Sequence, residues 1–148
     1  MGGRATAFRH GSSPRLAKAR GCGSPDGDGS ESVTEHEETC EGRPLALSDL
    51  ATGLLVEAES HHSRRAANTI LTGASMRATV IALADGAELA EHEAPPAATL
   101  QVLTGDLELA AGDDRWSLTA GQVIAIPQRR HSLRASTDAA VLLTVALR

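Results

Sequence analysis

Two stretches of the sequence decide the fold: residues 86–105, GAELAEHEAPPAATLQVLTG, and residues 121–131, GQVIAIPQRRH. Each stretch begins at a turn glycine, continues through strand-like residues and contains one histidine, His92 in the first and His131 in the second. Glycine marks tight turns because it adopts left-handed backbone angles without a steric penalty. The pattern therefore predicts β-strands that follow turns, with a single imidazole in each stretch.

The sequence around these two stretches alternates short apolar runs with turn residues such as Asp85-Gly86. Regular turn signals between short strands are typical of a sandwich or a closed barrel. We therefore expect an all-β domain. The candidate strands are 68–71, 76–84, 99–103, 107–110, 115–118, 123–126, 131–135 and 139–147.

One helix is expected before the strands. Ser48 is a candidate N-cap, and apolar residues then recur at spacings of three and four, which predicts a helix over about 48–60. Residues 1–43 are instead rich in Gly, Ser, Arg and acidic residues and have no hydrophobic period. Such a composition is typical of disorder. We expect a disordered tail at 1–43 and one folded domain at 44–148.

The composition excludes several classes of partner. The chain has 148 residues, a formal charge of -5, one Trp, one Phe and no Tyr, so it lacks the basic patch and the stacking platforms that nucleic acids require. No apolar run approaches the ~20 residues of a membrane span. Cys22 and Cys40 form no CxxC pair and are expected to be free thiols in a reducing compartment. We expect a cytoplasmic protein with no nucleic-acid or membrane partner.

The two stretches, together with the short hairpin between them, resemble the two motifs of the cupin family. The resemblance covers about 76–147, and the chain from Leu45 onward is also similar to small single-domain bacterial cupins. It implies a cupin-type jelly-roll barrel, here with one N-terminal helix and a disordered N-terminal tail. Because cupins commonly pair through sheet edges, it also implies a homodimer. The residues that carry the motif match are Gly86, His92, Gly105, Gly121, Pro127 and His131.

Cupins usually hold a metal on histidines, so the resemblance also implies where ligands would lie. The first motif of the family has His-x-His followed by a glutamate; here His92 takes the first position, whereas Ala94 and Ala98 stand at the second histidine and the glutamate. In the second motif His131 arrives one residue early. A divalent metal needs three or four donors at about 2.0–2.2 Å, so two imidazoles alone would hold one weakly.

A neighbouring carboxylate could supply a third donor. Glu88 is the candidate, because it lies four residues before His92 and shares its parity along a regular strand. Glu93 adjoins His92, and Gln101 lies an odd step from Ala98, so both are expected to face outward. The sequence thus leaves three interpretations of His92 and His131 open. They form a weak site for a divalent ion with Glu88 as the candidate third donor, they are polar and metal-free lining of a ligand pocket, or they are hydrogen-bonded structural residues.

Arg129 and Arg130 precede the second histidine directly. At the rim of the barrel mouth they could clamp an anionic ligand, because guanidinium groups bind carboxylates and phosphates in a bidentate manner. The alternative is a solvated turn.

Three functions stay open at this level. The first is a small-ligand-binding or sensory cupin with a degenerate metal site. The second is a metal-dependent enzyme, a dioxygenase or an isomerase, that uses His92 and His131 with an unusual third ligand. The third is a purely structural or dimer-forming protein. The number of metal donors discriminates between the first two, because the fold does not fix the function.

Overall fold

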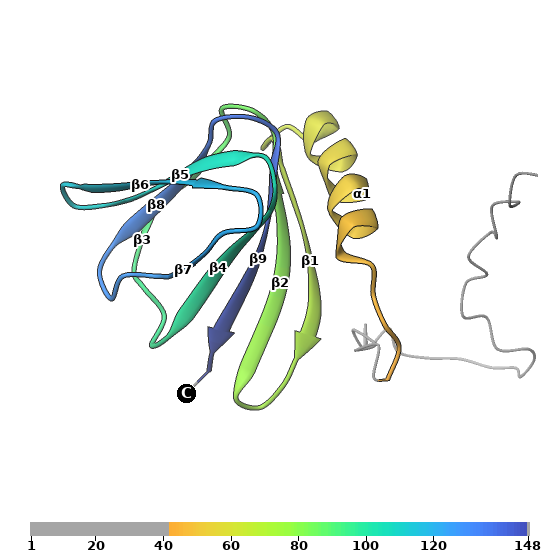
Figure 1. Cartoon of the computed structure of the whole chain (residues 1–148), viewed down its shortest axis with the longest axis horizontal. Coiled ribbons are helices and arrows are strands. Elements are labelled where there is room, and N and C mark those ends of the chain that lie inside the picture. Colours follow the sequence, from red (N-terminus) through yellow and green to blue (C-terminus); the bar gives the residue numbers. More distant parts are fainter. Residues whose placement is uncertain (1–41, 148) are drawn as a thin grey trace, which may run out of the picture. The chain divides into compact units, whose positions relative to one another are not determined.

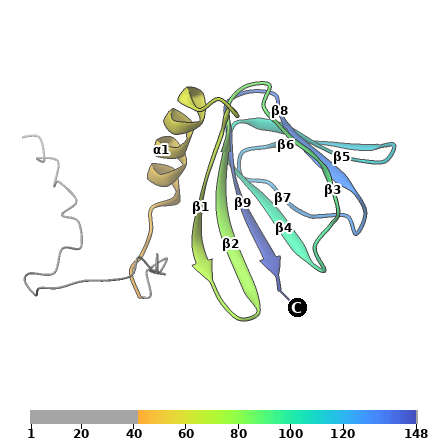
Figure 2. The same ribbon diagram turned by 180° about the vertical axis from the view of Figure 1, so that it is seen from behind.

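The computed structural model describes residues 42–147. Two antiparallel sheets face each other, and one helix lies against the outside of the larger sheet (Figure 1; Figure 2 shows the molecule from behind). Most of the predicted tail, residues 1–41, lies outside the described residues, as do Cys22 and Cys40. No helix within 42–147 has the length and the hydrophobicity that a membrane crossing requires.

Within residues 42–147, nine strands form the two sheets, and the eight predicted strands are all present with ends that differ by at most three residues. The five-stranded sheet has the order β1-β2-β9-β4-β7, and the four-stranded sheet has the order β3-β8-β5-β6. The larger sheet consists of β1 (Arg65–Thr72), β2 (Met76–Leu83), β9 (Ala139–Ala146), β4 (Ala98–Thr104) and β7 (Val123–Ala125). The smaller sheet consists of β3 (Glu88–His92), β8 (His131–Ala135), β5 (Asp106–Ala111) and β6 (Asp114–Thr119).

The larger sheet is covered on both faces, and the alternation of side chains along its strands explains why. On β2, Ile81 and Leu83 point to the space between the sheets, whereas Val80 and Ala82 point to the helix. Successive side chains of a strand lie on opposite faces, so the apolar run 80–83 of β2 separates two cores. One core fills the sandwich, and the other lies between the larger sheet and α1 (Leu47–Ser60).

The start of α1 differs from the prediction. The N-cap residue is Ala46, which makes no side-chain capping hydrogen bond, and Ser48 lies inside the first turn, where its carbonyl accepts a hydrogen bond from Thr52 Oγ1 at 2.9 Å. The prediction that Ser48 caps the helix is therefore wrong. Leu47 packs against the core between helix and sheet. Burial of this side chain accounts for a helix that begins one residue before the serine.

Candidate functional site

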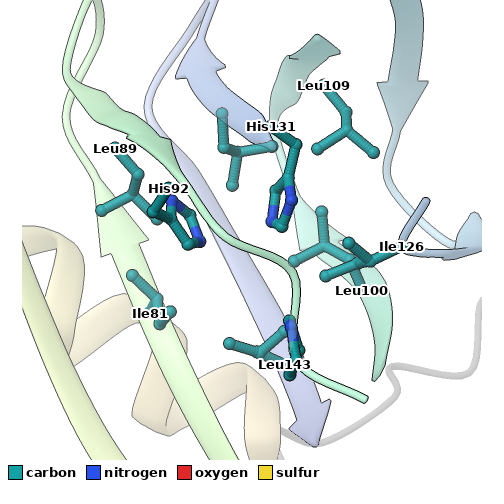
Figure 3. A pocket seen from close by; sticks show the side chains of 10 residues that line it. Ile81, Leu89, His92, Leu100, Leu109, Ile126, His131 and Leu143 are labelled. Atoms are coloured by element: carbon teal, nitrogen blue, oxygen red, sulfur yellow. The ribbon is translucent and has the colours of Figure 1, made fainter. Parts of the chain in front are cut away.

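A cavity of about 50 Å³ lies between the two sheets. Its walls are mostly aliphatic, and the polar part of the lining consists of His92 and His131, whose rings lie next to each other in Figure 3. The other lining residues are Ile81, Leu89, Pro95, Leu100, Leu109, Ile126, Leu133 and Leu143.

Neighbouring strands bring the two histidines together. His92 ends β3, His131 begins β8, and the two residues are direct partners across this antiparallel pair. Directly opposed residues point to the same face of a sheet, so both imidazoles face the sandwich interior. The ring centroids are 4.4 Å apart, and the ring planes are tilted by 58°. His131 is 3% exposed, whereas His92 is an exposed residue, so the pair extends from the core to the surface.

A bulge in β3 aims His92 into the cavity. Glu88 pairs with Arg134 and Leu89 with Leu133, but the next pair is His92 with His131, so two residues of β3 oppose one residue of β8. As a result Leu89 and His92 both line the cavity although they are three residues apart.

The same bulge decides the place of Glu88, the predicted third donor. With an extra residue between them, Glu88 no longer shares the face of His92. Glu88 is exposed, is not part of the cavity lining, and accepts a hydrogen bond on its main-chain oxygen from Arg65 Nη1 at 3.1 Å. The structure therefore brings His92 and His131 together without Glu88.

Main-chain carbonyl groups orient both imidazoles. His92 Nδ1 lies 2.9 Å from the oxygen of Ala90, and His131 Nδ1 lies 3.1 Å from the oxygen of Arg129. A carbonyl oxygen can only accept, so each Nδ1 must carry the hydrogen and donate it. In each neutral ring the second nitrogen, Nε2, is then an acceptor for a ligand or a metal ion.

The donor set does not fit the full metal site that the family usually has. Ala98 is buried in the core of the sandwich, and Ala94 lies between the end of β3 and the start of β4. Within residues 42–147, no group of three or more His, Cys, Asp or Glu side chains lies close enough together to hold a metal ion. The two imidazole nitrogens supply fewer donors than a tightly bound divalent ion needs.

Arg129 and Arg130, the predicted rim residues, lie among acidic side chains and do not line the cavity. Arg129 forms an ion pair with Asp114. Arg130 Nε donates to Glu91 Oε1 at 2.7 Å and Nη1 donates to Glu93 Oε1 at 2.8 Å. The hydrogen bond to Glu91, and then the one to Glu93, raises the pKa of Arg130 above its usual value. Both guanidinium groups are therefore held by carboxylates.

The outward direction of Glu93 and Gln101 agrees with the sequence analysis, because both residues are exposed. Two features of the site were not predicted. One is the aliphatic lining of the cavity, and the other is the bridge that Arg130 forms through its hydrogen bonds to Glu91 and Glu93. A signal for the bridge was present in the sequence, since His92 stands between Glu91 and Glu93 while His131 follows an arginine. When two strands pair at their histidines, the flanking opposite charges meet on the other face.

No protein-family model and no curated protein matches this chain. Several solved structures, in contrast, are similar to this chain. A cupin superfamily protein from Desulfitobacterium hafniense has a TM-score of 0.61 at 17% identity, covering 73% of this chain and 94% of that chain. An RmlC-like cupin from Desulfovibrio desulfuricans has a TM-score of 0.51 at 26% identity, covering 55% of this chain and 81% of that chain.

A conserved protein of unknown function from Streptococcus pyogenes is also similar, with a TM-score of 0.54 at 25% identity, covering 60% of this chain and 78% of that chain. The likeness to the Desulfitobacterium hafniense protein extends over most of the sandwich and almost all of the other chain. The two facing sheets, the positions of the motif residues and these likenesses lead to one conclusion: the chain has the cupin fold and belongs to the cupin superfamily.

Proposed function

We propose that this cupin binds a small, largely aliphatic molecule in the cavity between its sheets and recognises the polar group of that molecule through His92 and His131. The observation that carries the proposal is the convergence of two imidazoles, 4.4 Å apart, in a cavity whose other walls are aliphatic. Ligand pockets are typically apolar with a few convergent polar groups. A sensory role and a role as a binding protein both follow from such a pocket.

The hydrogen bonds of the two rings indicate which polar group would fit. Each Nδ1 donates to a main-chain oxygen, so each neutral ring offers an acceptor at Nε2. A ligand with one hydroxyl would donate to one of these acceptors, and a ligand with two donor hydrogens would satisfy both. A ligand with acceptors alone would leave them unpaired in an apolar cavity, which costs free energy.

The volume of the cavity limits the size of the ligand. A space of about 10–15 Å³ holds one water molecule, so a cavity of about 50 Å³ has room for a molecule with only a few carbon atoms. A larger ligand would extend past the exposed His92 to the surface. We therefore expect short branched alcohols to be suitable test ligands.

The alternative function, a metal-dependent dioxygenase or isomerase, needs more donors than the described part of the chain offers at this place. A divalent ion held by His92 and His131 alone would be bound weakly. Ligand binding without a tightly held metal agrees better with the two-nitrogen donor set.

The test compares 2-methylpropan-1-ol with its isomer 2-methoxypropane, which has the same atoms but no hydrogen-bond donor. Binding is followed by the NMR shifts of the methyl groups of Leu109 and Leu133, which line the cavity. One hydrogen bond contributes roughly 1 kcal/mol, so the alcohol should bind about fivefold more tightly than the ether. His131→Phe should remove this preference, whereas His62→Phe, at an exposed histidine outside the cavity lining, should keep it.

The proposal is contradicted if neither compound shifts these methyl resonances. It is also contradicted if the alcohol and the ether bind equally well to the unmodified protein.

A further inference from the structure

Arg130 bridges the two residues that flank His92. Its Nε donates to Glu91 Oε1 at 2.7 Å, its Nη1 donates to Glu93 Oε1 at 2.8 Å, and its Nη2 donates to the main-chain oxygen of Glu91 at 3.2 Å. Arg130 immediately precedes His131. One guanidinium group on the outer side of the sheet therefore connects the neighbours of both imidazoles.

The place of this bridge matters because the backbone around His92 is paired with a neighbouring strand on one side only. β3 is one of the two edge strands of the smaller sheet, and it pairs with β8 alone. The register shifts between Leu89 and His92, and β3 ends at His92. Bulges re-aim side chains, but the ladder hydrogen bonds are locally disrupted there.

We infer that Arg130 is a positioning residue: its bridge to Glu91 and Glu93 fixes the bulge that turns His92 toward His131. The link to ligand binding rests on the proposed function, whereas the link to the orientation of His92 does not. Arginine suits this role because its planar group offers five N–H donors in a fixed geometry, so that it can hold two carboxylates and a carbonyl group at once. Lysine would hold one partner at a time.

The bridge acts on local geometry and contributes little to global stability. The side chains of Arg130, Glu91 and Glu93 are 52%, 62% and 75% exposed. Exposed ion pairs contribute little to the stability of the folded state. Loss of the bridge should therefore release His92 while the rest of the sandwich stays folded.

The experiment measures nuclear Overhauser effects between the ring protons of His92 and His131 in the ligand-free protein. Rings whose centroids are 4.4 Å apart should give clear cross-peaks. Arg130→Met should weaken these cross-peaks at least threefold, and Arg130→Lys should give an intermediate loss. The control is Arg115→Met, which removes the same charge at a side chain of nearly equal exposure, 53%. The partners of Arg115 are on β5, on β6 and in the turn between these strands.

Thermal unfolding accompanies each variant, and all three melting temperatures should lie within about 3 °C of the unmodified protein, because exposed ion pairs stabilise weakly. Unchanged cross-peaks in Arg130→Met would overturn the inference, and so would an equal loss in Arg115→Met. If Arg130→Met does not fold, Glu93→Gln replaces it as the test, because this variant removes one of the two carboxylate partners. Glu93→Gln should weaken the cross-peaks partly. Unchanged cross-peaks in Glu93→Gln would overturn the inference.

A second measurement separates this inference from the proposed function. The affinity for 2-methylpropan-1-ol should fall in Arg130→Met by up to about fivefold, the value for complete loss of one hydrogen bond, because a mobile ring gains less from its hydrogen bond. If the unmodified protein does not bind the alcohol but the cross-peaks depend on Arg130, the proposed ligand is wrong and the positioning role stands.

Discussion

At the scale of single residues, Gly105 lies where two turns of the sandwich are in close contact. It follows β4 with a φ of 76°, a left-handed conformation that suits glycine. A Cβ atom at this residue would lie 2.2 Å from the main-chain oxygen of Asp138 and 2.7 Å from Cα of Ala139. The turn before β5 and the turn before β9 can pack together because residue 105 has no side chain.

Gly105→Ala should therefore destabilise the protein strongly. Gly86 is the matched control, because it also has a positive φ, 77°, but a Cβ there would meet nothing within 4 Å. The left-handed conformation costs about 1–2 kcal/mol for a residue with a side chain, which is the loss expected for Gly86→Ala. Gly105→Ala should lose at least about 2 kcal/mol more, since backbone atoms must move. Urea unfolding measures both values, and equal losses would contradict the close approach.

The tautomer of the two cavity histidines is a second prediction at this scale. Both Nδ1 atoms donate to main-chain oxygens, so at alkaline pH, where imidazole is neutral, both rings should carry the hydrogen on Nδ1. Long-range ¹H–¹⁵N correlation spectra distinguish the protonated ring nitrogen from the other. A hydrogen on Nε2 of His131 would contradict the description of the site as two converging acceptors.

At the scale of elements, α1 stabilises the larger sheet through one side of the helix. Leu54 is 6% exposed and packs with Val80 and Ala140 in the core between helix and sheet, whereas Val56, two residues further along, is 66% exposed. The helix is therefore bound to the sheet by a narrow apolar stripe.

Leu54→Ala should lower the free energy of unfolding by about 2–4 kcal/mol, because it removes buried methyl groups and leaves a cavity. Val56→Ala should change it by no more than about 0.5 kcal/mol, because its side chain is mostly in water. Chemical denaturation of the two variants gives the comparison. Similar small losses for both would show that the helix is not an integral part of the fold.

The elements also show what the sequence could predict. The alternation of apolar residues and the turn glycines were sufficient for the strands, because side-chain direction has a period of two and turns need special residues. The bulge in β3 was not predictable, since an extra residue in a five-residue strand leaves no mark in an alternating pattern. The motifs assigned His92 and His131 to one site, but their pairing across β3 and β8 was not predicted. The parity argument for Glu88 fails because the bulge adds a residue between Glu88 and His92.

At the scale of the whole molecule, the larger sheet has two edge strands, β1 and β7. Unpaired strand edges invite pairing with another chain. β1 is eight residues long and lies beside α1, whereas β7 has only three residues. We therefore propose that the protein forms a homodimer through the side that carries β1.

Leu71→Lys should shift the dimer to a monomer, because it introduces a charge on β1 at a side chain that is 36% exposed. Val123→Lys, on the opposite edge strand β7, should leave the dimer intact although Val123 is more exposed, at 64%. Multi-angle light scattering reports the mass of each variant. A monomer mass for the unmodified protein, or dissociation caused by Val123→Lys alone, would contradict this assignment.

We propose that the histidine pair serves a small ligand and holds no metal ion tightly. The most direct test is elemental analysis of the purified full-length protein after dialysis against a chelator. Two imidazoles without a carboxylate bind a divalent ion weakly, so we expect well below one metal ion per chain. One zinc, iron, nickel or manganese ion per chain that survives the chelator, and that is lost in His131→Ala, would contradict it.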